Sequence, residues 1–205
     1  MSRSSMLDKL EEIYSHGKYT AKDYFKLPEG SPYQLIEGEL IMTPSPLTEH
    51  QIISKNLELL IFTHVKKYNL GLALNAPIDV YLDNKNAYQP DIIFISNKNK
   101  DIIKKRGIDG SPDLVIEILS PSNEYYDIKI KKEVYERRGV IEYIIIGPET
   151  KSVEIFRRTG SGNLKTKASS GKFDEILSVK AENSGGLHIK TLDLTIDLKD
   201  IFTEI

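Results

Sequence analysis

Two short apolar segments, residues 89–96 and 112–120, each carry an acid within or beside a run of β-branched side chains. Runs of this kind, bounded by proline and polar residues, predict buried β-strands. Asp91 stands at the start of the first run, and Glu117 lies in the middle of the second. A buried carboxylate is unfavourable unless a cation or hydrogen-bond donors compensate for it. The pair therefore predicts neighbouring strands that share one divalent ion bound by oxygen ligands.

The segment after Glu117 predicts a parallel crossover. Residues 127–138 have helical character and are closed by Gly139, and residues 142–146 form another apolar strand. A strand, a helix and a strand within about thirty residues form a parallel crossover unit. Because side chains alternate along a strand, Glu117 is expected on the same face as Leu119 and opposite its immediate neighbours.

One face of this predicted helix carries Asp127, Lys131 and Tyr135 at intervals of four residues. Two interpretations are open. Asp127 and Lys131 can form an ion pair on the surface, worth a few tenths of a kcal/mol. Alternatively, the face covers the strand that bears Glu117 and brings an ammonium group to the two carboxylates, where it can orient a water or offset charge on a phosphate.

Ahead of the acidic pair, the sequence predicts two short helices followed by two strands. Residues 5–14 have apolar positions at helical spacing, and a second helix begins near Thr20 and ends before Pro28. Residues 33–42 fit two strands around a turn or bulge at Gly38. We expect the helices to dock outside the catalytic core.

A long amphipathic helix follows. Ser45 as cap and Pro46 in the first turn predict its beginning, and Gly71 predicts its end. His50 and His64 both lie on it, about four turns apart, which is too far for both to bind one metal directly. His64 is expected to be packed or partly exposed. A site role and a structural role both stay open for His50, near the helix start.

Residues 72–76 and 78–82 predict strands, and the polar cluster 83–86 predicts a hairpin turn into residues 88–96. Residues 97–110 are polar and rich in lysine, with a possible short helix inside them. Solvated surface charge is the ordinary interpretation, and contact with phosphates beside the acidic site is the functional one. The candidates for phosphate contact are Lys98, Lys100, Lys104, Lys105 and Arg106.

The C-terminal part predicts smaller elements. Residues 152–157 and 164–169 are expected to form a hairpin, residues 180–196 further edge strands, and residues 198–205 a closing helical turn. No repeat or linker divides the 205 residues, so a single domain is expected.

Composition limits the possible functions. The net charge is −2, so a nucleic-acid partner would need a local basic surface. The absence of cysteine excludes disulfides, thiolate zinc sites and a cysteine nucleophile, and it suits the cytoplasm. The apolar runs are too short to span a membrane, and the N-terminus has no signal-peptide core.

An ordered set of motifs resembles the Uma-type restriction endonuclease family, part of the PD-(D/E)xK, or restriction-endonuclease-like, superfamily. The resemblance covers roughly residues 20–158, with a weaker match at residues 192–202. The motifs are Leu-Ile-Glu-Gly-Glu-Leu at 35–40, Ser45-Pro46, Gln89-Pro90-Asp91, the string from Pro112 to Ser122, Asp127 with Lys131 and Tyr135, and Glu142-Tyr143.

The resemblance implies an α/β fold with a central mixed β-sheet flanked by helices. It also implies an Mg²⁺ (or Mn²⁺) site with Asp91 and Glu117 as metal ligands and a lysine close to them. The superfamily's simplest pattern places that lysine two residues after the glutamate, where this sequence has Leu119. Lys131 is the residue that can supply the amine from another direction. Glu39 matches the glutamate of the family's Gly-Glu segment and can add a third acid.

The function implied is metal-dependent hydrolysis of nucleic-acid phosphodiester bonds, with DNA as the expected substrate. Within the single domain, residues 1–30 would form N-terminal helices, residues 33–158 the nuclease-like core, and residues 159–205 C-terminal strands and a short helix. Superfamily analogy suggests a homodimer. Two alternatives remain: a catalytically inactive nucleic-acid-binding module of the same fold, and a structural or interaction protein.

Overall fold

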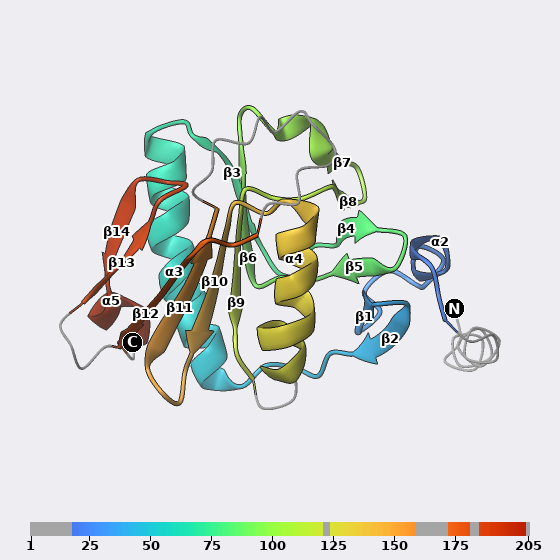
Figure 1. Cartoon of the computed structure of the whole chain (residues 1–205), viewed down its shortest axis with the longest axis horizontal. Coiled ribbons are helices and arrows are strands. Elements are labelled where there is room, and N and C mark those ends of the chain that lie inside the picture. The colour runs from blue at the N-terminus through green and yellow to red at the C-terminus, as the bar shows by residue number, and fades with distance from the viewer. Residues whose placement is uncertain (1–17, 121–123, 159–171, 181–184, 204–205) are drawn as a thin grey trace.

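The computed structural model describes residues 18–120, 124–158, 172–180 and 185–203 (Figure 1). The helix predicted for residues 5–14 lies outside these ranges. None of the helices within them has the length and apolar character needed to cross a membrane.

A mixed six-stranded sheet, the central sheet, occupies the middle of the molecule. In spatial order it contains β12 (Glu175–Lys180), β11 (Ser152–Arg157), β10 (Glu142–Gly147), β9 (Leu114–Ile118), β6 (Ile92–Ser96) and β3 (Gly71–Asn75). Strands β9 and β10 are parallel, and the other neighbours are antiparallel. The connection between β9 and β10 includes a π-helical segment, η2 (Tyr126–Lys131), and α4 (Lys132–Arg138). The predicted crossover is therefore confirmed.

A second six-stranded sheet, the side sheet, lies next to α4 in Figure 1, with helix α2 (Ala21–Tyr24) beyond it. Its spatial order is β2 (Glu39–Met42), β1 (Tyr33–Ile36), β5 (Asn86–Tyr88), β4 (Val80–Asp83), β8 (Gly107–Asp109) and β7 (Ile103–Lys104). The mixed α/β class is as predicted, but the residues flanking the central sheet form a sheet as well as helices.

Apolar side chains cover both faces of the central sheet. Leu114, Ile116 and Ile118 pack on the face that holds the long helix α3. Helix α3 spans Thr48–Lys67, and the same face also contacts the C-terminal elements β13 (Gly186–Ile189), β14 (Leu194–Asp197) and α5 (Leu198–Phe202). Val115 packs on the opposite face, against α4 and the side sheet. The predicted alternation therefore places Glu117 on the α4 side.

Helix α3 differs from the prediction at both ends. It begins at Thr48, after an N-cap at Leu47, so Ser45 and Pro46 lie ahead of it. It ends at Lys67, and the chain reverses with Asn69 at φ 51°, a left-handed conformation that asparagine tolerates. Gly71 instead begins β3, where a Cβ atom would collide with the backbone of Ile95 on β6.

The segment expected to be one strand over residues 88–96 belongs to two sheets. Within this segment, β5 ends at Tyr88 and β6 begins at Ile92. Pro90 lacks a backbone N–H for a strand ladder, and the Gln89 side chain donates to Asp79 Oδ1 at 2.9 Å. The chain therefore leaves the side sheet here and enters the central sheet with Asp91 at its edge.

Other connections also depart from expectation. The possible helix near residue 100 is a single 3-10 turn, η1 (Lys100–Ile102), followed by β7 and β8. The predicted hairpin partner at residues 164–169 lies outside the described residues, and β11 pairs with β12 instead. The C-terminal strands and closing helix are present as β13, β14 and α5.

Candidate active site

Asp91 and Glu117 lie on adjacent strands of the central sheet. In the β6–β9 ladder Ile92 faces Ile116, so continuing this register by one residue places Asp91 opposite Glu117. Asp91 Oδ2 also accepts a hydrogen bond of 2.7 Å from the backbone N–H of Ile118. The two acids therefore lie together at one end of these two inner strands of the central sheet.

Lys131 joins this pair from the crossover helix. Its Nζ lies 3.0 Å from Glu117 Oε1 and 2.7 Å from Asp127 Oδ1. The side chains of Lys131, Glu117 and Asp127 are 2%, 4% and 3% exposed, so the three groups form a buried cluster. The interpretation of Asp127 and Lys131 as a surface ion pair is wrong, and the interpretation in which the helix face covers Glu117 agrees with the geometry.

The helix carrying Lys131 has an unusual backbone. Residues Tyr126–Lys131 are π-helical, and the α-helical pattern resumes at Lys132. Single π turns inside helices occur frequently at functional sites. Tyr135, one turn further along, donates a hydrogen bond of 2.9 Å from its hydroxyl to Glu117 Oε1. The same carboxylate oxygen is thus held by an ammonium and a phenol.

Leu119 occupies the strand position where the simplest superfamily pattern has a lysine. Its side chain packs against the apolar cluster on the α4 side, and its backbone N–H donates to Ile146 O at 2.8 Å. The ammonium that reaches Glu117 belongs to Lys131. The amine is therefore present at the glutamate, although it comes from a different element.

His50 contacts Asp91 from the first turn of α3. Its Nε2 lies 3.3 Å from Asp91 Oδ2, and the side chain is 10% exposed. Its Nδ1 is buried and has no hydrogen-bond partner among the described residues. His64 instead lies 3.0 Å from Leu192 O and packs against the ring of Tyr68. The structure therefore places His50, but not His64, beside the acidic pair.

Burial and charge shift the pKa values of the cluster. Burial, reinforced by Asp127 and Asp91, raises the pKa of Glu117 to about 8 although Lys131 opposes the shift. Burial likewise raises the pKa of Asp127. The two neighbouring carboxylates outweigh burial and raise the pKa of Lys131. Three carboxyl groups, Glu117, Asp127 and Asp91, thus interact with one another around a cluster that has one lysine, and the cluster favours additional positive charge.

Burial alone would favour neutral His50, but the hydrogen bond and charge of Asp91 outweigh it. The pKa of His50 is therefore raised above its usual value. A backbone contribution from Ile118 acts in the same direction. Oδ2 of Asp91 thus contacts two partners, the Ile118 N–H and the imidazole of His50.

Glu39 is not part of this cluster. It is the exposed first residue of β2, at the outer edge of the side sheet. Among the described residues, no hydrogen bond or ion pair connects it to Asp91, Glu117 or Lys131. The structure therefore does not bring the predicted third acid to the pair.

The lysine-rich segment also lies away from the acids. Asp91 precedes β6, whereas Asn97 follows it, so the segment leaves from the opposite end of the strand. Figure 1 shows β7 and β8 at the top of the view, and the end of β9 and the start of α3 at the bottom. The expectation that this loop lies beside the site is wrong, because β6 carries the chain across the sheet first.

The fold is similar to that of a solved structure, a putative nuclease belonging to DUF820 from Anabaena variabilis, with a TM-score of 0.72. The two sequences are 22% identical, and the match covers 89% of this chain and 97% of that chain. A search of curated proteins finds no significant match. The sequence profile of the Uma2 family, described as putative restriction endonuclease, matches residues 21–189. The chain belongs to the Uma2 family.

The site of this Uma2 member fits a divalent ion of the magnesium type. Over the described ranges, no group of three or more His, Asp or Glu side chains is arranged to hold a metal. Mg²⁺, however, usually binds through one or two carboxylates and completes its shell with water and substrate phosphate. Asp91 and Glu117 each have one oxygen committed to protein donors, and their other oxygens, Oδ1 and Oε2, accept no hydrogen bond from described residues.

Two contributors to the site were weakly signalled by the sequence. The helical spacing identified Tyr135 on the face of Lys131, but it did not indicate that its hydroxyl reaches Glu117. The sequence does not decide the role of His50, because the partner of a lone histidine on a helix depends on the tertiary fold. Its place near the start of α3 was the only available signal.

Proposed function

We propose that this protein is a metal-dependent endonuclease that hydrolyses phosphodiester bonds of DNA. The observation that carries the proposal is the convergence of Asp91, Glu117 and Lys131 at one edge of the central sheet. Membership of the Uma2 family and the nuclease-like fold support the same reaction class.

Asp91 and Glu117 would hold Mg²⁺ or Mn²⁺ through their uncommitted oxygens. When bound, the ion polarises the phosphoryl oxygen and lowers the pKa of a coordinated water. His50 and the Ile118 N–H fix the orientation of Asp91, and Tyr135 fixes that of Glu117. Such preorganisation keeps the carboxylates in place while charge develops on the substrate.

Lys131 has two tasks in this arrangement. Its ammonium opposes the rise in the pKa of Glu117 that burial causes, because an opposite charge at 3.0 Å favours the carboxylate. It also offers positive charge close to the phosphate and the attacking water. The second contact to Asp127, at 2.7 Å, fixes the amine in this place.

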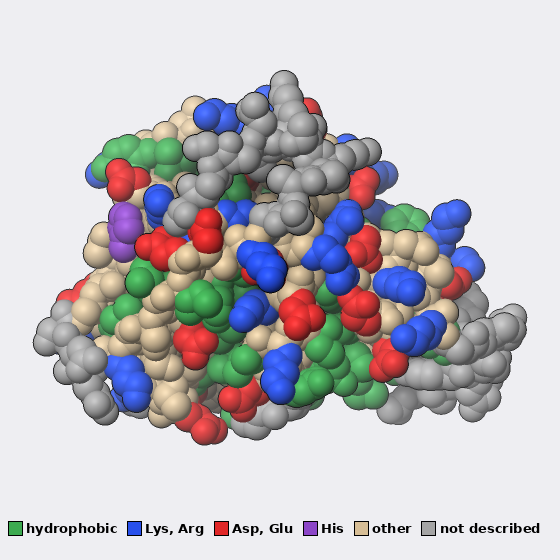
Figure 2. Space-filling model, viewed as in Figure 1, with side chains coloured by type: hydrophobic (Ala, Val, Ile, Leu, Met, Phe, Trp, Pro, Cys, Tyr) green, Lys and Arg blue, Asp and Glu red, His purple; other side chains and the backbone are tan. Residues whose placement is uncertain are grey.

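The surface provides little general attraction for DNA. Figure 2 shows acidic and basic side chains interspersed over the face that carries α4. With a net charge of −2, binding must rest on local contacts and should weaken steeply with added salt. Assays at low ionic strength are therefore the informative ones.

Plasmid cleavage with Mg²⁺ or Mn²⁺ tests the proposal. The parent protein should cut, and Asp91→Ala and Glu117→Ala should each abolish cutting. Glu154→Ala is the matched control, because Glu154 is an exposed acid on β11 outside the cluster, and it should cut like the parent. Circular dichroism should establish that each variant is folded.

The outcomes separate the three functions that the sequence left open. Cutting that both site variants lose supports the endonuclease. Binding of DNA by the folded parent protein without metal-dependent cutting contradicts it and identifies a binding module. Absence of affinity for DNA or RNA in a low-salt mobility-shift titration identifies a structural or interaction protein.

We further propose that residues 1–205 form one domain and that the protein acts as a cytoplasmic homodimer. A single cooperative unfolding transition would support one domain. Light scattering at assay concentration would distinguish a dimer from a monomer, and fractionation of expressing cells would test the compartment.

A further inference from the structure

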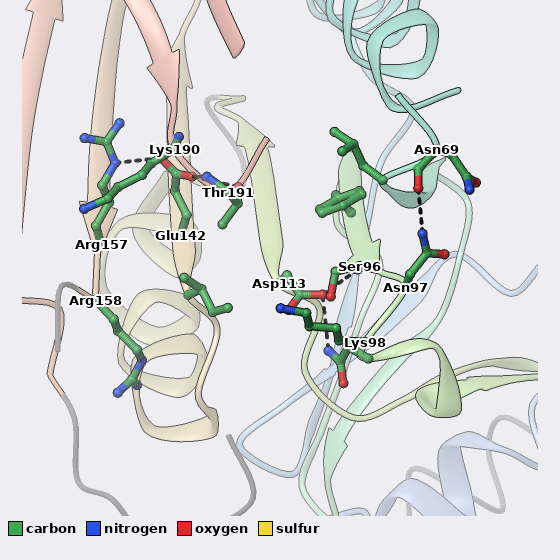
Figure 3. A pocket seen from close by; sticks show the side chains of 14 residues that line it. Asn69, Ser96, Asn97, Lys98, Asp113, Glu142, Arg157, Arg158, Lys190 and Thr191 are labelled. Atoms are coloured by element: carbon green, nitrogen blue, oxygen red, sulfur yellow. Dashed lines mark hydrogen bonds and ion pairs between the residues drawn. The ribbon is translucent and has the colours of Figure 1, made fainter. Parts of the chain in front are cut away.

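One motif of the family, Glu142-Tyr143, lies outside the cleavage site. It begins β10, and because side chains alternate along a strand, its two residues point to opposite faces of the central sheet. Glu142 is fully buried and accepts hydrogen bonds from Arg157 Nε at 2.7 Å and from Thr191 Oγ1 at 2.8 Å. Figure 3 shows Glu142 between these two side chains. Glu142 therefore holds the connection between β13 and β14, whereas Tyr143 points to the opposite side.

Tyr143 faces the helical connection between β9 and β10. In the parallel ladder of these strands it lies opposite Val115, so its side chain is on the same face of the sheet as Glu117. The side chain is fully buried, and its hydroxyl donates a hydrogen bond of 2.9 Å to the backbone oxygen of Asp127. Its ring also packs against that of Tyr135, with the ring centroids 4.9 Å apart. Tyr143 therefore contacts both ends of the helix face that covers Glu117.

This connection is π-helical over Tyr126–Lys131. From Asp127 to Tyr135, regular α-helix would turn through about 800°, which would leave the two side chains about 80° apart around the helix axis. A π turn takes up one residue more than an α turn, which reduces this offset to about 20°. The π turn therefore places the two side chains almost in line, on the face from which Lys131 reaches Glu117 at 3.0 Å.

The contact of Tyr143 with the backbone oxygen of Asp127 gives a physical cause for this local geometry. Insertion of a side chain into the hydrogen-bond ladder of a helix is a common cause of local departures from α geometry. A buried carbonyl needs a donor, and a hydroxyl supplied by a neighbouring strand fixes that carbonyl relative to the sheet. Because β10 lies beside β9, which carries Glu117, the same hydroxyl relates the π turn to the carboxylate that Lys131 contacts.

We propose that Tyr143 is a positioning residue of the cleavage site: its hydroxyl holds the π turn that directs Lys131 toward Glu117. The importance of this contact for cleavage rests on the proposed function, in which Lys131 acts close to the phosphate. The placement of the ammonium is a property of the folded protein, so it can be measured without metal or DNA.

Acetylation of Lys131 by acetic anhydride, followed by mass spectrometry in buffer that contains EDTA, measures this placement. In the parent protein the buried ammonium, 2% exposed, should react far more slowly than exposed Lys66 of the same molecule. Tyr143→Phe removes the hydroxyl and keeps the ring, so Lys131 should react about two- to tenfold faster, the range expected when one hydrogen bond is lost. The rate at Lys66 should not change.

Tyr24→Phe is the matched control. Tyr24 is also a buried tyrosine whose hydroxyl lies 2.9 Å from a backbone oxygen, that of Tyr33, but it belongs to a separate apolar cluster of α2 and the side sheet. Tyr24→Phe should lose stability in urea unfolding and leave the acetylation of Lys131 unchanged. In cleavage assays with Mg²⁺, Tyr143→Phe should lower kcat and leave KM nearly unchanged, because the buried Tyr143 side chain touches no substrate.

An unchanged acetylation rate of Lys131 in Tyr143→Phe would overturn the inference. So would an equal increase in Tyr24→Phe, because the hydroxyl would then act through general stability. Faster acetylation together with an unchanged kcat would refute the role of the contact in cleavage. A parent protein that cuts no DNA would contradict the endonuclease but leave the acetylation result standing, so the two failures are distinguishable.

Discussion

Replacing Lys131 with methionine should destabilise the protein strongly. The substitution keeps most of the side-chain volume but leaves Glu117 and Asp127, which are 3% and 2% exposed, without their shared cation. Removing one partner of a buried ion pair costs about 3–5 kcal/mol, because the remaining charge is uncompensated. Two carboxyl groups lose their partner here, so we expect a loss within this range, and the largest loss at a pH at which both are ionised in the parent protein.

The loss should depend on pH in a defined direction. The folded-state pKa of Glu117 is raised from 4.5 to about 8, so the stability linked to it is present below about 4.5 and lost as the pH rises through about 8. Without Lys131, the pKa of Glu117 would rise further. The penalty of Lys131→Met should therefore be smaller at about pH 5 than at about pH 8.

Urea denaturation of the parent and Lys131→Met at both pH values measures the penalty. Lys131→Met/Glu117→Gln serves as the matched control, because it removes one of the stranded charges and should recover part of the stability. A penalty below about 1 kcal/mol at the higher pH, the range of exposed ion pairs, would contradict the buried cluster. So would a penalty that is independent of pH and unaffected by the second substitution.

Three further predictions concern the carboxylates. Mg²⁺ at a hundredfold excess over its Kd should stabilise the folded protein by about 2.7 kcal/mol, measured by thermal unfolding, and Asp91→Asn should abolish the effect. His50→Ala should weaken Mg²⁺ binding about tenfold in calorimetry because Asp91 loses an orienting partner, and equal affinity in both proteins would exclude that role. Arg157→Met should cost about 3–5 kcal/mol in urea unfolding because Glu142 is left buried and unpaired; Arg157→Met/Glu142→Gln should restore part of this loss, and no recovery would refute the explanation.

The central strands and the crossover were predictable because their signal is local. Val115, Ile116 and Glu117 show the strand and its two faces directly, since alternation depends only on neighbouring residues. The side sheet was not predictable as a separate layer. Its strands are as short as two residues, and the change of sheet between Tyr88 and Ile92 depends on partners far away in the sequence.

The site was partly predictable for a similar reason. Asp91 and Glu117 stood out because charged residues beside buried strands need compensation. The spacing of Asp127 and Lys131 placed them on one face, but only the packed structure determines whether that face is buried. Glu39 shows that a motif match does not establish a contact, because Glu39 matches the family's Gly-Glu segment but does not contact Asp91 or Glu117.

The position of the amine in space should matter more than its position in the chain. Leu119 is half-buried and, by strand alternation, lies on the same face as Glu117. A lysine at this position can direct its ammonium toward the same carboxylate and can extend toward solvent when needed.

Lys131→Met should therefore cut DNA poorly, and Lys131→Met/Leu119→Lys should recover a measurable part of the metal-dependent cleavage. Leu119→Lys alone separates this gain from any effect of the new lysine itself. If the double variant folds, binds Mg²⁺ and still cuts no faster than Lys131→Met, the amine is needed in the place defined by both Glu117 and Asp127. The contact with Asp127, at 2.7 Å, would then be part of the catalytic geometry rather than a support for the helix.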